Sequence, residues 1–164
     1  MAARIITPAD WRDQPWKNGL GVTREVARWP EASGAYDVRI SVAEVLGSRS
    51  TAFSTFPGYL RWSTLLANDL LGLQTIDQPT HWLRAGQLAQ YDGSVALSTA
   101  ICDGAATLLN VLAKPDLIEV GLGAADAVDF VFAISAVDAL PRWHARLFEV
   151  PATVTGEVLW LRFG

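Results

Sequence analysis

Short strand-like segments separated by turn signals constrain the fold of this chain more than any other feature. Apolar and polar residues alternate along many of them, so that Val38, Ile40 and Val42 share one face of a strand and Arg39 and Ser41 share the other. This period of two is typical of β-strands. Pairs such as Asn-Gly, Pro-Gly and Asp-Gly separate the segments. The predicted strands are residues 22–29, 38–42, 60–66, 70–76, 95–101, 107–113, 128–134 and 157–163.

This spacing favours an all-β sandwich or barrel, because long amphipathic helices do not alternate with the strands. One helical turn is predicted near the start, where Thr7 can cap it, Asp10 lies in its first turn and Pro15 ends it. Residues 121–127, rich in Gly and Ala, are interpreted as a loop. No linker divides the chain, so residues 1–164 are expected to form one domain. The turn spacing is compatible with two pseudo-halves, about 1–95 and 96–164.

The composition excludes several classes of protein. Of the 164 residues, 51% are hydrophobic and 18% charged, which is ample material for a core. The formal net charge is −4 and there is no Lys/Arg-rich run, so nucleic acid is not expected as a partner. The N-terminus lacks the apolar core of a signal peptide and no membrane-spanning stretch occurs. We therefore expect a cytoplasmic protein that has no membrane partner.

Few residues are available for metal binding or nucleophilic catalysis. The chain has two histidines, His81 and His144, each beside a tryptophan, and one cysteine, Cys102. A mononuclear site needs two or three imidazoles with a carboxylate on neighbouring strands, and neither histidine belongs to a His-x-His pair. Cys102 lies in a strand-like apolar run, and no Gly-x-Ser-x-Gly motif occurs. The sequence thus predicts no metal site, no cofactor and no catalytic residue of these types.

The segment WKNGLGVTREV, residues 16–26, contains the densest group of polar candidates. Its Asn-Gly pair allows a tight reversal of the chain. Lys17, Asn18 and Arg24 can donate hydrogen bonds to an anionic or carbonyl-bearing ligand. The alternative is a hairpin in which Arg24 and Glu25 form surface ion pairs.

A second segment, FSTFPGYLRW at residues 53–62, places Arg61 among aromatic and aliphatic residues. An arginine in such surroundings needs an acidic partner or a ligand, and a bidentate carboxylate is its natural one. Arg39 and Ser41 lie opposite the apolar face of their strand and point either into a cavity or to solvent. For both arginines the alternative is a solvated or ion-paired position.

These motifs resemble those of the HutD/Ves family. The resemblance is carried by residues 16–26, 38–45, 53–66 and 105–113, which match the family's Trp-Lys-Asn-Gly block, its following strand, its Phe-Pro-Gly…Arg turn and its later strand ending in Asn. Leu20 and Val38 depart from the family's usual Gly and Trp, and residues 107–110, Thr-Leu-Leu-Asn, stand where the family has Asp-Leu-Asn. The resemblance implies a cupin-like double-stranded β-helix with two β-barrel-like halves, as in a bicupin, and no established enzymatic activity. Some members are encoded with histidine-utilisation genes and are thought to modulate that pathway.

Three functional hypotheses follow. The first is a metal-free, cupin-like protein that binds a small anionic metabolite, with Arg61 holding a carboxylate. The other polar candidates would complete its lining: Lys17, Asn18, Arg24, Glu25, Arg39 and Ser41. The second is a metal-independent isomerase or lyase that uses Glu25 or another carboxylate as general base. The third is an interaction module whose Trp-rich strand edge forms a homodimer.

Overall fold

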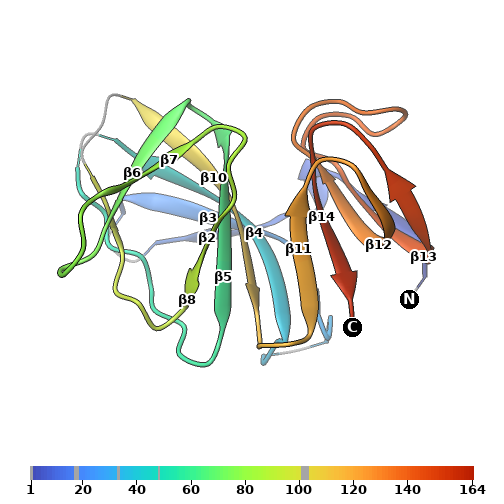
Figure 1. Cartoon of the computed structure of the whole chain (residues 1–164), viewed down its shortest axis with the longest axis horizontal. Helices are drawn as coiled ribbons and strands as arrows, with labels where there is room; N and C mark the ends of the chain where they lie inside the picture. The colour runs from blue at the N-terminus through green and yellow to red at the C-terminus, as the bar shows by residue number, and fades with distance from the viewer. Residues whose placement is uncertain (1, 17–18, 33, 48, 101–103) are drawn as a thin grey trace. The chain divides into compact units, whose positions relative to one another are not determined.

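Apart from one short 3-10 helix, the regular secondary structure of the described residues consists of antiparallel β-strands (Figure 1). Its computed structural model describes residues 2–16, 19–32, 34–47, 49–100 and 104–164. Two compact units are present, Arg12–Pro115 and Met1–Trp11 with Asp116–Gly164. The predicted all-β class is confirmed, whereas the pseudo-halves 1–95 and 96–164 are a different division of the chain and stay a prediction.

The larger unit contains two sheets. A six-stranded sheet has the order β2-β3-β4-β10-β5-β8, and a three-stranded sheet has the order β7-β6-β9. Buried apolar residues from both sheets form one cluster, which includes Val45, Leu73 and Leu108, so the core lies between the sheets. The strands are β2 Arg12–Pro15, β3 Gly21–Trp29, β4 Val38–Leu46, β5 Leu60–Ala67, β6 Leu70–Gln74, β7 His81–Arg84, β8 Ala89–Asp92, β9 Ser98–Thr99 and β10 Ala105–Ala113.

Strand β4 is buried on both faces. Val38, Ile40 and Val42 are at most 2% exposed on one side. On the other side, Arg39 and Ser41 are followed by Ala43 and Val45, which belong to the apolar core between the two sheets. One face of the six-stranded sheet therefore carries an apolar end, which closes the core, and a polar end, which carries the arginine.

The smaller unit is a five-stranded sheet with the order β1-β13-β12-β14-β11. Phe130 and Phe132 are fully buried in β12, and the Trp11 ring stacks on Phe132 at 6.2 Å between ring centroids. Its elements are β1 Arg4–Ile6, the 3-10 helix η1 Pro8–Asp10, β11 Ile118–Leu122, β12 Ala125–Ala133, β13 Ala145–Val154 and β14 Val158–Phe163.

The predicted helical turn is confirmed as η1, where the Thr7 N–H donates to Asp10 Oδ2 at 2.7 Å. Pro15 does not end a helix, because it lies in β2. The loop predicted over residues 121–127 is wrong, since only residues 123–124 separate β11 from β12. Gly121 is a strand residue over which the Trp160 ring packs so closely that a Cβ would lie 2.3 Å from it.

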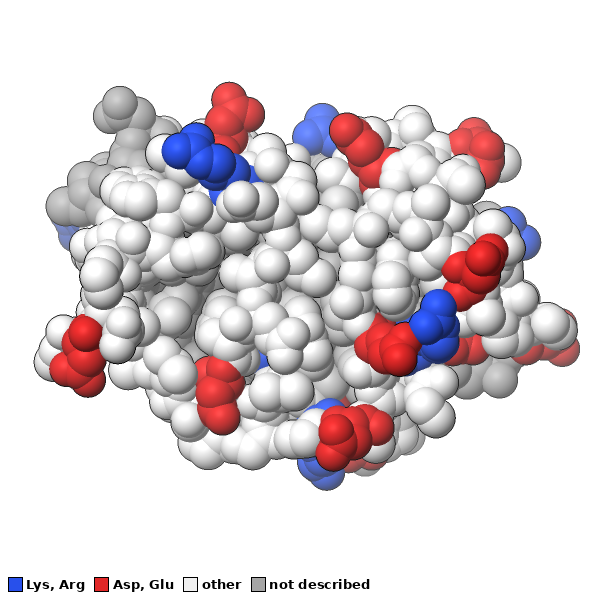
Figure 2. Space-filling model, viewed as in Figure 1, with Lys and Arg blue, Asp and Glu red and all other residues white. Residues whose placement is uncertain are grey.

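No helix in the part of the chain that the structure describes is long and apolar enough to cross a membrane. On the face shown in Figure 2, the Lys and Arg side chains lie apart from one another among Asp and Glu side chains. This face therefore offers no continuous basic surface.

Candidate ligand-binding site

Two arginines are placed on one face of the six-stranded sheet by its register. Arg39 in β4 and Arg61 in β5 both pair with Leu112 of the intervening strand β10. Because neighbouring strands are about 4.8 Å apart, the two backbones stand about 10 Å apart across β10. Side chains in register share a face, so both guanidinium groups belong to the polar end of this sheet.

A second polar row lies two residues further along the same strands. Asn110 of β10 pairs with Ser41 of β4 on one side and with Ser63 of β5 on the other. The Ser63 hydroxyl donates to Asn110 Oδ1 at 2.6 Å and lies 2.9 Å from the Tyr91 hydroxyl. This leaves the Nδ2 of Asn110 as a donor without a partner among the described residues.

These rows border a cavity of about 460 Å³, which is within the size range of small-molecule sites. One wall is made by Trp16, whose Nε1 donates to the Thr23 hydroxyl at 2.8 Å and whose ring meets Phe53 edge-on at 6.0 Å between ring centroids. The lining residues are Gln14, Pro15, Trp16, Thr23, Arg39, Ser41, Ala43, Ala52, Phe53, Ser54, Phe56, Arg61, Asn110 and Leu112.

Arg61 is a buried cation without a carboxylate partner in the described part of the chain. Its residue exposure is 7%, its Nε has no hydrogen-bond partner, and Nη1 reaches only the Ser54 carbonyl at a long 3.5 Å. The guanidinium lies 5.0 Å from the centroid of the Phe53 ring, with two further aromatic rings within 6 Å. Burial lowers the pKa of Arg61, as expected when solvent is removed from a cation.

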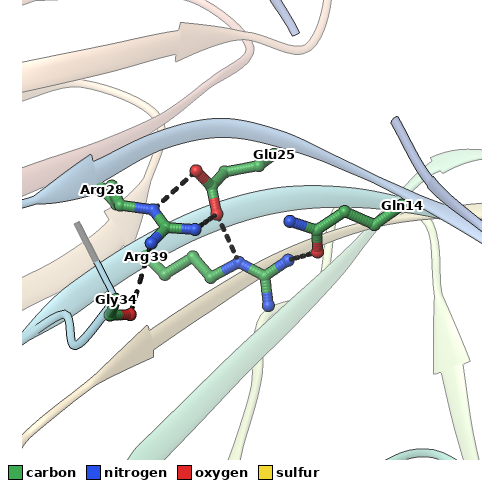
Figure 3. Close-up of polar contacts among 5 residues, drawn as sticks. All are labelled: Gln14, Glu25, Arg28, Gly34 and Arg39. Carbon is green, nitrogen blue, oxygen red and sulfur yellow. Dashed lines mark hydrogen bonds and ion pairs between the residues drawn. The ribbon is translucent and has the colours of Figure 1, made fainter. Parts of the chain in front are cut away.

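Arg39, in contrast, is held by a carboxylate (Figure 3). Its Nε donates to Glu25 Oε2 at 3.0 Å and its Nη2 donates to Gln14 Oε1 at 2.6 Å. Glu25 also accepts two hydrogen bonds from Arg28, at 2.7 and 2.6 Å. Glu25 and Gln14 thus engage two of the three guanidinium nitrogens of Arg39, Nε and Nη2, and the side chain lines the cavity.

Glu25 is poorly suited to act as a base. Burial raises the pKa of its carboxyl, but the hydrogen bonds from Arg28 and the charges of Arg28 and Arg39 lower it by a larger amount. The pKa of Glu25 therefore lies below its ordinary value. Both carboxylate oxygens are already occupied by arginine donors. No Asp, Glu, His, Lys or Cys occurs among the described lining residues.

The structure brings together three of the predicted site residues, Arg39, Ser41 and Arg61, at the cavity. Glu25 lies behind Arg39 and does not line it. Arg24 lies outside the lining, because it alternates with Thr23 and Glu25 along β3, and it forms ion pairs with Asp13 at 3.3 Å and Glu44 at 3.4 Å. The predicted residues Lys17 and Asn18 lie outside the described residues, as does Cys102.

Sequence reasoning missed Asn110, and it missed the ring of Tyr91 beside Arg61, which comes from the neighbouring strand β8. The available signal was Asn110 in the mostly apolar run of residues 105–113, because a buried amide requires hydrogen-bond partners. The two histidines lie in different units, His81 in β7 and His144 just before β13. Among the described residues, no three His, Cys, Asp or Glu side chains gather in a way that could hold a metal ion.

Comparison with known proteins identifies relatives of this chain. It is 30% identical over 112 residues to the protein Ves of Citrobacter koseri, and 31% identical over 113 residues to an uncharacterised 21.2 kDa protein of Pseudomonas putida from the hutC 3′ region. Each match covers 68% of this chain and 58% of the relative, so the aligned part spans little more than half of either relative.

Solved structures match nearly the whole chain. HutD from Pseudomonas fluorescens SBW25, determined in a formate condition, superimposes with a TM-score of 0.83 at 22% identity and covers 98% of this chain and 97% of HutD. A conserved protein of unknown function from Pseudomonas aeruginosa PAO1 gives a TM-score of 0.75 at 24% identity, with coverages of 98% and 92%. At these identities the matches establish the fold.

The fold and the cavity define an all-β protein with a polar cavity, and the all-β class is the one predicted from the sequence. The HutD family matches residues 8–139, which is well over half of the chain. The chain belongs to the HutD family.

Proposed function

We propose that this protein binds a small carboxylated metabolite in the cavity bordered by Arg39 and Arg61, without a metal ion and without transforming it. The observation that carries the proposal is the buried Arg61 guanidinium, which faces the cavity and has no acidic partner among the described residues. A buried charge is costly unless it is paired, and a carboxylate ligand would supply the missing acceptors.

The rest of the lining supports binding through hydrogen bonds. The Nη1 group of Arg39, the Ser41 hydroxyl and the Asn110 amide can donate to further oxygens of the ligand. Membership of the HutD family, and a relative from the hutC region, support the further proposal that the bound metabolite lets the protein modulate histidine utilisation.

The alternative of a metal-independent isomerase or lyase needs a carboxylate of raised pKa that faces the cavity. Glu25 has a lowered pKa and both of its oxygens are engaged. No described residue of the lining is acidic, so binding is the better supported function.

Isothermal titration with N-formylglycine and imidazoleacetate tests the proposal. An Arg–carboxylate contact contributes roughly 1.5–3 kcal/mol, so Arg61→Met should weaken binding by about tenfold to a hundredfold. Arg84→Met is the matched control, because Arg84 is an exposed arginine of β7 that does not line the cavity. Absence of binding to the wild-type protein, or equal binding to Arg61→Met, would overturn the proposal.

A further inference from the structure

In the larger unit, a second cavity adjoins the cavity bordered by Arg39 and Arg61, which is called the anion site below. It has a volume of about 530 Å³, and Ala52 and Phe53 line both cavities. The shared wall is anchored to the second cavity, because Ala52 forms a β-bridge with Ser98 and the Phe53 N–H donates to the Leu97 carbonyl at 2.8 Å. The Phe53 ring lies 5.0 Å from the Arg61 guanidinium, so the wall contacts the arginine on the other side.

The second cavity differs from the first in its chemistry. None of its described lining residues carries a charge. Its polar groups are the side-chain amides of Gln74 and Gln78 and the hydroxyls of Thr75, Thr80 and Ser98. Amides and hydroxyls both donate and accept hydrogen bonds, which suits an uncharged polar ligand.

One of these groups is buried without a partner. The Thr75 hydroxyl oxygen is inaccessible to solvent and forms no hydrogen bond with a described residue, whereas its neighbour Gln74 donates from Nε2 to the Thr80 hydroxyl at 3.2 Å. A buried hydroxyl that lacks a hydrogen bond costs roughly 1–3 kcal/mol, so such groups are rare unless water or a ligand pairs with them. Because solvent does not reach this oxygen, Thr75 takes no part in recognition, and the polar contacts of the second cavity come from Gln74, Gln78, Thr80 and Ser98.

From these observations we infer that the ligand is an elongated molecule whose carboxylate lies at Arg61 and whose uncharged amide- or hydroxyl-bearing tail crosses the Ala52–Phe53 wall into the second cavity. The inference rests on the proposed function for its anionic end and adds a class of ligand to it. Cavities of this volume commonly enclose most of the surface of a much larger ligand than a carboxylate of a few atoms. The combined volume of the two adjoining cavities therefore suits an elongated molecule.

Calorimetric titration with three probes tests the inference: acetate, hexanoate as a carboxylate with an apolar tail, and N-acetylglycylglycine as a carboxylate with two amides. N-acetylglycylglycine should bind about tenfold or more tightly than either other probe, because only its tail can form hydrogen bonds in the second cavity. The double variant Gln78→Ala/Thr80→Val should abolish that advantage and leave acetate binding unchanged. Gln90→Ala, at an exposed glutamine of β8 that lines neither cavity, is the matched control.

The outcomes separate this inference from the proposed function. If all three probes bind with equal affinity and all depend on Arg61, the anion site stands and the second cavity has no role in recognition. If the double variant weakens all probes equally while its thermal unfolding is unchanged, the tail site is also overturned. If no probe binds to the wild-type protein, the proposed function fails and the inference fails with it.

Discussion

Glu25 Oε2 lies 3.0 Å from the Nε of Arg39, and this ion pair is almost completely buried, with side-chain exposures of 3% and 11%. The same oxygen lies 2.6 Å from Arg28 Nη2, so one carboxylate holds two guanidinium groups. Glu25 thus acts as a positioning residue for the candidate site: it orients Arg39 toward the cavity without lining it.

Glu25→Gln should destabilise the protein strongly. The substitution keeps the shape of the side chain but leaves two arginines without their carboxylate, and breaking a buried pair costs roughly 3–5 kcal/mol. We expect a loss near the lower end of that range, because Arg28 is partly exposed. Urea unfolding measures this loss in the free energy of unfolding. The control is Glu44→Gln, because Glu44 is a half-exposed partner of Arg24, and there we expect a loss below about 1 kcal/mol. Equal effects of the two substitutions would contradict the structural role of Glu25.

The stability of the protein should fall in acid through the same carboxyl. The pKa of Glu25 is lower in the folded protein than its ordinary value of 4.5, so its stabilising contribution is complete above that value and is lost as the pH falls through the folded pKa. Asp10 and Asp92, whose pKa values are lowered by hydrogen bonds from Thr7 and Ser94, titrate in the same direction.

Unfolding free energies measured from pH 7 down to pH 3 would isolate the contribution of Glu25 to the loss of stability in acid. The wild-type curve should fall below about pH 4.5 more steeply than the curve of Glu25→Gln, which has no group to protonate there. Parallel curves over this range would show that the carboxyl titrates alike in the folded and unfolded chain.

Arg61→Met should separate stability from binding. Removing a buried cation whose Nε is unpaired relieves an energetic cost, while methionine keeps most of the apolar contact with Phe53. We expect the free protein to be as stable as the wild type or more stable, with a melting temperature raised by up to about 2–4 °C for each kcal/mol gained. A marked fall in melting temperature in the absence of ligand would show that Arg61 is a structural residue.

Asn110→Asp should weaken anion binding without disturbing the sheet. The change is isosteric, and the carboxylate can still accept the hydrogen bond from Ser63. A negative charge in the cavity opposes a carboxylate ligand by about 2 kcal/mol, or roughly 30-fold in affinity. Asn68→Asp makes the same change of net charge at an exposed turn, and its affinity should stay within twofold of the wild type. Equal losses in both variants would point to a general charge effect.

The sequence predicted the class of fold and the two arginines, because both depend on local patterns. The alternation along residues 38–42 separates Arg39 and Ser41 from the apolar face, and the aromatic surroundings of Arg61 are adjacent in the chain. Strand parity also shows that Arg24 and Glu25 cannot face the same cavity, a constraint that the prediction of both residues ignored.

The part that local patterns could not show is the register across β10. Asn110 lies 69 residues after Ser41 in the chain, yet the two are paired in neighbouring strands, and Leu112 lies between the two arginines for the same reason. Short strands such as β1 and β7 were missed because they lack a clear alternation and are defined mainly by their partners.

Gly21→Ala should weaken both the fold and the anion site. A Cβ at this position would lie 2.6 Å from the Glu44 carbonyl and 2.8 Å from the Trp16 ring, so backbone or ring must move. Overpacking of this kind costs roughly 1–3 kcal/mol, and a displaced Trp16 would lose its hydrogen bond to Thr23 and open the cavity wall. We expect a lower unfolding free energy and weaker binding of N-formylglycine, together with a change in tryptophan fluorescence.

Gly19→Asn is the control for this prediction. Gly19 has open space around its Cβ position and a φ of +69°, a backbone that asparagine tolerates, so the affinity should be unchanged. If Gly21→Ala binds the probe as tightly as the wild type, the Trp16 wall does not contribute to the site.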